Sequence, residues 1–303
     1  MKTLRIPFTL LCVLAISALS AHVTHASQLA TAKVISVEGT VTKHTTGGIK
    51  LNGRERQVKV GDILSEGDSV NSSADSQAFL VFSNGSEITI SENTSVKIAE
   101  LVQEPYDSSQ TYEQLQADPS KSQTLLKLNY GQLDGHVKKL SEASSFRVKT
   151  PLGTAAIRGT KFNVKLVFDR DTNKFELTIR NLDGLVDFIG QERADYYLID
   201  DINGDPEKVK NEFDDEALIE PTTLPEETAL IVTCGQENLV FNAIIGVLAA
   251  IPGVDVGVNV DGSVTVTVDI PPVTNPDVDD PLPAPVITPE DPGIIVVSPE
   301  DQG

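Results

Sequence analysis

The stretch SFRVKTPLGTAAIRGTKFNV, residues 145–164, alternates apolar and polar side chains on both sides of a Pro-Leu-Gly break. Alternation with a period of two is typical of β-strands that bury one face. Proline fixes φ and glycine tolerates positive φ, so Pro151 and Gly153 favour a turn. The stretch therefore predicts two amphipathic strands that meet at residues 151–153.

The second of these strands contains an arginine among small residues, in the order Ala-Ala-Ile-Arg-Gly-Thr. Small side chains allow close approach of two backbones, as at the corner of a sheet. The five donors of Arg158 can then satisfy several carbonyls and tie two hairpins together. Alternatively, the guanidinium grips the carboxylate of a ligand. The candidate structural or ligand corner consists of Thr150, Pro151, Arg158, Gly159 and Thr160.

Residues 32–190 repeat this pattern as about a dozen short strands with glycine turns and no convincing helix. Residues 78–90, AFLVFSNGSEITI, predict a hairpin around Asn84-Gly85. Residues 175–190 predict another around Asp183-Gly184. The predicted fold class is all-β, an antiparallel β-sandwich or β-roll of short hairpins.

The 303-residue chain has a net charge of −20, which is concentrated in its last third. Residues 201–303 hold 21 of the 44 acidic residues, 13 of the 17 prolines and two of the 24 basic residues. Such an acidic region repels nucleic acid and anionic lipid, so we expect neither as a partner. Residues 271–303 show no period, and we expect them to be disordered.

The N-terminus predicts a secretory signal peptide. Lys2 and Arg5 precede an apolar run from Ile6 to Ala21, and small residues around Ala26 fit a cleavage site, with Ala21 as the alternative. The run is short for a membrane span, so we expect export and no transmembrane span after cleavage.

After this cleavage Cys234 is the one remaining cysteine, so no internal disulfide can form. The apolar neighbours of Cys234 predict that it is buried.

The region after residue 228 is the least regular. ALIVTCGQENLVF, residues 229–241, reads as one more hairpin of the body, and NAIIGVLAAI as a short helix or a buried strand. Residues 254–270 predict a hairpin. The expected organisation is a signal peptide (1–26), a β domain (32–199), an acidic linker (200–228), additional hairpins that can pack on the β domain (229–270) and a Pro/Asp-rich tail (271–303).

Residues that could support catalysis or metal binding are few. His44 and His136 are far apart in sequence, and no nucleophile elbow, phosphate loop or dinucleotide motif is present. Two oxygen-rich patterns, one at Asp169, Asp171 and Asn173 and one from Asp201 to Glu212, read as solvated turns rather than calcium loops. We expect no enzyme activity, no metal and no cofactor.

Two segments together resemble the FecR-type domain, the family of the iron-dicitrate sensor. The first is GDILSEGDSVNSSADSQAFLVFSNGSEITISENTSVKI, with two Gly-Asp turns and Asn-Gly-Ser between strands. The second has Thr150-Pro151, then Arg158-Gly159-Thr160-x-Phe162. The resemblance covers about residues 34–190, with later strands as an extension to 241. It implies a periplasmic sensor domain, whose best-known member contacts an outer-membrane iron-siderophore transporter.

The plan of that family also includes a cytoplasmic anti-sigma segment before a membrane helix. Because five residues precede the apolar run here, we expect no such segment and an exported domain instead. The resulting hypothesis is a binding module for an envelope protein or a ligand, with a role in signalling or regulation, in the periplasm or at the surface of a Gram-negative-type bacterium. The alternative is a structural or adhesive surface protein that uses the β domain for assembly.

Overall fold

The computed structural model describes residues 28–45, 55–107, 109–190, 195–199, 207–208, 222–236, 239–251, 253–259 and 263–268. The predicted signal peptide, most of the predicted acidic linker, the predicted tail and the Asp201–Glu212 pattern lie outside these residues.

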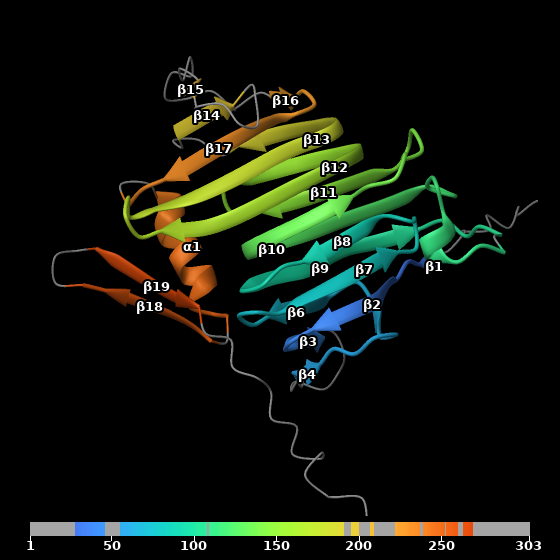
Figure 1. Cartoon of the computed structure of the whole chain (residues 1–303), viewed down its shortest axis with the longest axis horizontal. Helices are drawn as coiled ribbons and strands as arrows, with labels where there is room; N and C mark the ends of the chain where they lie inside the picture. Colours follow the sequence, from blue (N-terminus) through green and yellow to red (C-terminus); the bar gives the residue numbers. More distant parts are fainter. Residues whose placement is uncertain are drawn as a thin grey trace, which may run out of the picture.

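The fold is one large sheet that closes on itself and forms two layers, with a helix and a small two-stranded sheet at one end (Figure 1). The first layer contains β1 (Gln28–Leu29), β3 (Val41–Thr45), β4 (Arg56–Gln57), β6 (Asp68–Ser72), β9 (Thr94–Gln103), β11 (Ser145–Thr150) and β16 (Thr222–Leu224). The second layer contains β2 (Ala32–Glu38), β5 (Ile63–Leu64), β7 (Gln77–Phe82), β8 (Glu87–Ile90), β14 (Asp195–Ile199), β15 (Glu207–Lys208) and β17 (Thr228–Cys234).

Three long strands belong to both layers: β10 (Ser122–His136), β12 (Gly153–Asp169) and β13 (Lys174–Gly190). The first half of β10 pairs with β9 and β11, and its second half pairs with β8 and β12. The halves of β12 and β13 also change partners, because β13 pairs with β16 near one end and with β17 near the other. Each long strand therefore crosses from one layer to the other.

Aromatic side chains join the layers in the core. The Phe146 ring on β11 lies 5.9 Å from that of Phe82 on β7 and 6.4 Å from that of Phe162 on β12, measured between ring centroids. All three side chains are at most 1% exposed. The three phenylalanines thus point into the space between the two layers.

The all-β prediction is confirmed, and the structure differs from a set of short antiparallel hairpins in two respects. First, β10 and β11 pair in parallel over residues 123–127 and 145–149, so the sheet is mixed. The loop after His136 makes this possible, because it returns the chain from the second layer to the start of β10. Second, β10, β12 and β13 contain 15 to 17 residues each.

The Asp183-Gly184 pair shows why the strands are longer than expected. It is not the turn of a hairpin; it lies inside β13, where that strand changes layers. The register between β12 and β13 shifts between Arg158 and Lys161, which marks a β-bulge opposite this pair. Gly184 therefore allows a bend within one strand. The same Asp-Gly pair can form a hairpin turn, and the sequence alone does not distinguish the two.

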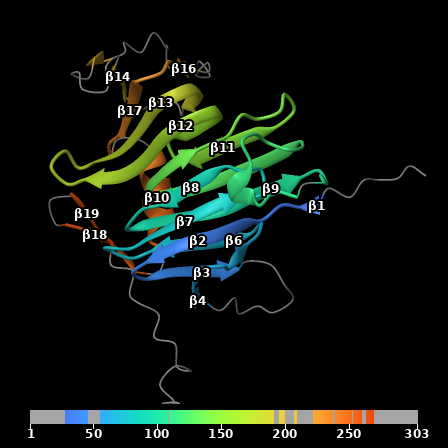
Figure 2. The same ribbon diagram turned by 45° about the vertical axis from the view of Figure 1, so that its right-hand side comes forward.

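Two other hairpins follow the sequence prediction. β7 and β8 flank Asn84-Gly85, and the carbonyl of Phe82 accepts a hydrogen bond from the Gly85 N–H at 2.8 Å. Near the C-terminus, β18 (Val254–Val258) and β19 (Val264–Val268) form the small separate sheet. In Figure 2 this small sheet lies beside α1, away from the edge that carries β14 and β16.

The hairpin predicted for residues 229–241 is incorrect. Residues up to Cys234 form β17, whereas α1 (Leu239–Leu248) begins inside the expected second strand. The apolar residues Phe241, Ile244 and Leu248 recur at helical spacing and are at most 1% exposed. Phe241 packs on Phe175, with ring centroids 5.2 Å apart, so α1 covers one end of the sandwich. Cys234 is buried, as expected.

Candidate functional site

The residues of the predicted corner fall into two separate groups in the structure. Thr150 and Pro151 form the turn between β11 and β12, whereas Arg158, Gly159 and Thr160 lie within β12. At about 3.3 Å per residue along a strand, the two groups are on the order of 20 Å apart.

The turn is held by the side chain of Thr150. Its buried hydroxyl donates to the Gly153 carbonyl at 3.0 Å and accepts from the Leu152 N–H at 3.2 Å. A Cβ on Gly153 would lie 2.3 Å from the Phe188 ring, so only glycine fits there. The Thr-Pro-x-Gly order therefore builds a turn, and Pro151 is left at the molecular surface.

The second group forms the point where β12 crosses between layers. The hydroxyl of Thr160, which is fully buried, lies 2.8 Å from the carbonyl oxygen of Arg158 and 2.9 Å from that of Leu185, and it accepts from the Leu185 N–H at 3.0 Å. The backbone of Thr160 exchanges two hydrogen bonds with Val137, at 2.9 and 3.0 Å. Thr160 therefore ties β12 to β13 and to the segment that follows β10.

Arg158 does not make the contacts expected of it. Its side chain is exposed, and its guanidinium makes no hydrogen bond or ion pair in the part of the chain that the structure describes. A guanidinium is too long to fold back onto the carbonyls beside its own backbone, whereas the short threonine hydroxyl already lies between them. The predicted corner is thus divided between the turn and the crossover, and at the crossover Thr160, not Arg158, makes the hydrogen bonds between segments.

The other two crossovers use the same device, a left-handed glycine beside a buried polar side chain. Gly131 in β10 has φ +96° and adjoins Gln132, whose N–H donates to the Thr94 hydroxyl at 2.9 Å. Gly184 in β13 has φ +89°, and the amide nitrogen of Asn181 lies within 3.0 Å of the carbonyls of Gly184, Leu224 and Pro225. Backbone groups released by the change of partner are thus satisfied internally.

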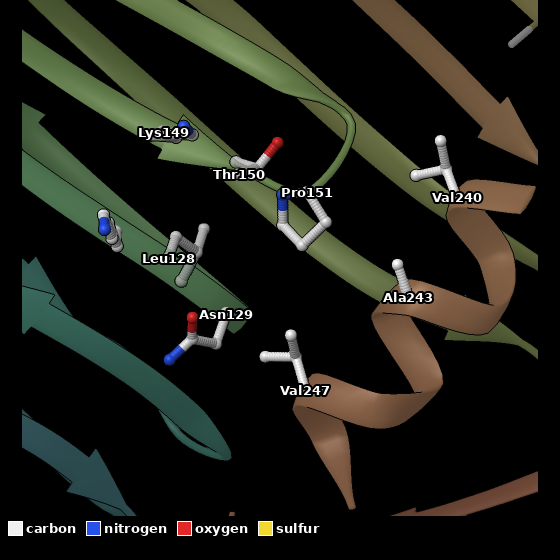
Figure 3. A pocket seen from close by; sticks show the side chains of 9 residues that line it. Leu128, Asn129, Lys149, Thr150, Pro151, Val240, Ala243 and Val247 are labelled. Carbon is white, nitrogen blue, oxygen red and sulfur yellow. The ribbon is translucent and has the colours of Figure 1, made fainter. Parts of the chain in front are cut away.

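A groove lies between α1 and the outer face of the first layer. It consists of two adjoining cavities of about 620 and 320 Å3, which share Asn129, Ala243 and Val247. Figure 3 shows Thr150 and Pro151 on one wall and Val240, Ala243 and Val247 of α1 on the facing wall. The predicted turn residues Thr150 and Pro151 therefore border an open cavity, whereas the crossover residues do not line it.

The two walls of the groove differ in chemistry. On the sheet, polar side chains from β3, β6, β9 and β10 line it, namely His44, Ser69, Asn71, Ser95 and Asn129. The helix contributes small and apolar residues, namely Ala243, Gly246 and Val247, and Ala250 follows in the turn after it. Lys127 and Lys149 stand at the Pro151 end, and Glu55, whose carboxylate accepts from the Thr42 hydroxyl at 2.6 Å, stands at the other.

The two histidines and the acidic turn lie apart from one another. His44 lines the groove, whereas His136 Nδ1 is 3.7 Å from the Glu87 carboxylate on the outer face of the second layer. The Asp169 carboxylate accepts from the Thr172 hydroxyl at 2.6 Å and the Asp171 N–H at 2.9 Å, and these bonds lower the pKa of Asp169. Among the described residues, no three Cys, His, Asp or Glu side chains form a potential metal site.

Burial also affects a tyrosine near the groove. Tyr130 occupies the crossover of β10, next to Asn129, and desolvation raises its pKa. Its hydroxyl oxygen accepts a hydrogen bond from the Phe168 N–H at 3.4 Å. Tyr130 therefore remains neutral over the physiological range and serves as a fixed hydrogen-bonding group.

Asn181 and the groove were not predicted from the sequence, for different reasons. Asn181 carries a local signal, because its position beside Asp183-Gly184 suggests a polar side chain at a bend. The groove carries none, because it is formed by His44, Asn129 and Val247, which come from distant parts of the chain. The apolar spacing of α1 could have located one of its walls.

Comparison with known protein families agrees with the resemblance noted in the sequence. Two crystal structures of a protein described as a "putative anti-sigma factor" from Parabacteroides distasonis are similar at 12% identity and a TM-score of 0.30. The match covers 52% of this chain and 60% of that protein. No curated protein sequence matches the chain. The family model described as FecR protein matches residues 68–186, so this chain contains a FecR domain.

Proposed function

We propose that this protein is a non-enzymatic binding module of the bacterial envelope that acts in signalling or regulation. The observation that carries the proposal is the open groove, because the FecR domain supplies much of its floor and α1, which follows the domain, supplies its other wall. A regulatory rather than catalytic role follows the family of the matched domain.

The walls of the groove suit a protein or peptide ligand. Binding sites commonly combine apolar walls with a few polar groups that fix orientation. Val247 is 40% exposed at the centre of the helix wall, opposite the side chain of Asn129. An apolar side chain of a partner can pack on Val247 while its backbone reaches the polar side chains of the sheet.

The envelope location rests on the apolar run from Ile6 to Ala21 and on the family resemblance. Within the described residues, no helix has the length and apolar character needed to cross a membrane. N-terminal sequencing of the protein from the periplasmic fraction tests the location. We expect the mature chain to start after Ala26, or after Ala21; an intact Met1 on exported material would contradict the signal peptide.

The binding role is tested by chemical crosslinking in cells followed by mass spectrometry. We expect one envelope protein to be recovered reproducibly with the wild type and about tenfold less with Val247→Arg, since a buried charge at an interface centre is costly. The matched control is Leu185→Arg, because Leu185 is also 40% exposed but lies at the crossover. Equal recovery with both variants, or no partner of the wild type, would refute the proposal.

A further inference from the structure

Three lysines form a row across the first layer, beside the groove. Lys97 on β9 is directly opposite Lys127 on β10, and Lys127 is directly opposite Lys149 on β11. Neighbouring strands are about 4.8 Å apart, and like charges in opposite positions destabilise a sheet. None of these ammonium groups has a hydrogen bond or ion pair within the described chain. We call this row the lysine ladder.

The ladder brings three like charges together in a chain whose net charge is −20. On the outer face of the second layer, several charged groups have partners. There, Glu87 contacts Lys138 at 2.9 Å, and Asp134 accepts from the amides of Gln132 and Asn163, each at 2.8 Å. Three adjacent positive charges without such partners form a surface that suits a negatively charged group from outside the described residues.

We propose that the ladder and the groove bind an acidic, extended peptide, and that the occupant is the tail of the same chain, residues 271–303. The proposal rests on the proposed function in that both locate binding in the groove. The tail contains seven acidic residues and no basic one. It also contains Ile294, Ile295, Val296 and Val297, whose apolar side chains match the helix wall.

The path of the chain supports this occupant. β19 ends at Val268, which is paired with Val254 on β18. The Val254 N–H donates to the carbonyl of Ile251 at 3.1 Å, and Ile251 lines the groove. The chain therefore leaves the described structure within a few residues of the groove, so the tail reaches it without a long connection.

The composition of the tail fits a groove better than a sheet edge. Nine of its 33 residues are proline, which cannot donate to a β-ladder and favours the polyproline II conformation. In that conformation the backbone carbonyls point outward and can accept hydrogen bonds from Asn71 and Asn129 in the groove. At about 3.1 Å per residue, the tail is long enough to span both cavities. A partner that enters the groove must then displace the tail.

The first test uses the full mature chain and a carbodiimide, which joins lysine amines directly to carboxylates. We expect mass spectrometry of the monomer to find links from Lys127 and Lys149 to carboxylates between Asp277 and Asp301. Lys161 and Lys165, exposed on the second layer, are internal controls and should not link to the tail. Mixing 14N- and 15N-labelled protein separates links within one chain from links between chains. Links only between chains, or equal links from the controls, would refute the proposal.

The second test uses a single tryptophan, since the chain contains none. Val296→Trp places it in the tail of the full chain. We expect blue-shifted emission and several-fold weaker quenching by acrylamide than for a free peptide of residues 271–303 with the same change. Both effects should disappear in Lys97→Gln/Lys127→Gln/Lys149→Gln and at high salt, which screens exposed charges. Circular dichroism checks that this variant is folded.

Lys161→Gln/Lys165→Gln is the matched control and should leave the emission and the quenching unchanged. Quenching equal to that of the free peptide, or identical in the ladder and control variants, would overturn the proposal.

The experiments distinguish failure of the tail proposal from failure of the proposed binding function. If the tail is free but partner recovery still depends on Val247, the tail is not the occupant and the binding role stands. If the tail is docked and no partner is recovered, the binding role fails instead.

Discussion

The crossovers and the groove are both rich in polar residues, yet they use them in opposite ways. At the crossovers, Thr160 and Asn181 are fully buried and their donors are directed at backbone carbonyls of neighbouring segments. Along the groove, Asn129 and Lys149 line an open cavity, and the Asn129 amide donates to the Ser95 hydroxyl at 3.5 Å. Polar groups satisfied within the protein stabilise its fold, whereas polar groups left at a cavity are available to a ligand. The sequence motif that identifies the domain belongs mainly to the first kind.

The largest loss of stability should come from a side chain added where two strands approach closely at a crossover. Gly184→Ala places a Cβ 2.4 Å from the Gly159 carbonyl oxygen at φ +89°. We expect the free energy of unfolding to fall by about 3 kcal/mol or more, from backbone strain plus the clash. Chemical denaturation measures this.

Gly61→Ala separates the two contributions. Gly61 has φ +87°, but a Cβ at this position would have no neighbouring atom within 4 Å. The variant should therefore lose only about 1 kcal/mol, from strain alone. Equal losses at the two positions would mean that close approach of β12 and β13 does not matter.

Removal of the Thr160 hydroxyl tests how much its hydrogen bonds to Leu185 stabilise the crossover. Thr160→Val keeps the shape of the side chain but leaves the Leu185 N–H without its acceptor. We expect a loss of about 2 kcal/mol, the cost of an unsatisfied buried donor. Thr154→Val, on the same strand but half-buried on the outer face, should change stability by less than about 0.5 kcal/mol. Similar losses from both would remove the distinction between buried and exposed threonines.

The exposed ion pair between Lys33 and Glu113 should contribute less to stability than the Thr160 hydroxyl does, and its contribution should depend on pH. The pKa of Glu113 is lowered from 4.5 to about 2 by hydrogen bonds from its own backbone N–H, from Lys33 and from Thr111. The Lys33 and Glu113 side chains are 2.9 Å apart at the surface, near β2. A lowered pKa in the folded state stabilises the protein above the unfolded pKa, and this contribution is lost as the pH falls from 4.5 towards 2.

Glu113→Gln should therefore cost less than about 1 kcal/mol at pH 7, and the difference from the wild type should shrink below pH 4.5 and vanish below about pH 2. Urea denaturation of both proteins across this range provides the measurement. A difference that persists at the acid end would show that the carboxylate charge is not the cause.

Arg158→Ala should have the smallest effect. Because the side chain is exposed and makes no hydrogen bond or ion pair within the described residues, we expect the melting temperature to be unchanged within error. A marked loss of thermal stability would show that the Arg158 side chain stabilises the crossover.

The sequence was informative where a local signal has one structural meaning. Asn84-Gly85 and Thr150-Pro151-Leu152-Gly153 both predicted turns, and both turns exist. Asp183-Gly184 has the same local chemistry but lies at a bend within β13, because pairing with distant strands decides whether a glycine ends a strand or bends it. Thr160 was among the residues of the predicted corner, but the sequence suggested that Arg158 would make the hydrogen bonds that Thr160 makes.

The groove could not be predicted from the sequence at all. Its walls come from β3, β6, β9 and β10 on one side and from α1 on the other, and no local pattern links them. The same holds for the lysine ladder, because Lys97, Lys127 and Lys149 become neighbours only through the registers of β9, β10 and β11. One of those registers is a parallel pairing, which no local sequence signal indicates.

The most direct test of the distinction between crossover and groove is photo-crosslinking in growing cells. A photoreactive amino acid is placed at Val247 in one strain and at Leu185 in another, since both side chains are 40% exposed. We predict discrete products from Val247, joined to the tail of the same chain or to an envelope partner, and none from Leu185. Products of equal yield from both positions, or products from Leu185 alone, would contradict the assignment of binding to the groove.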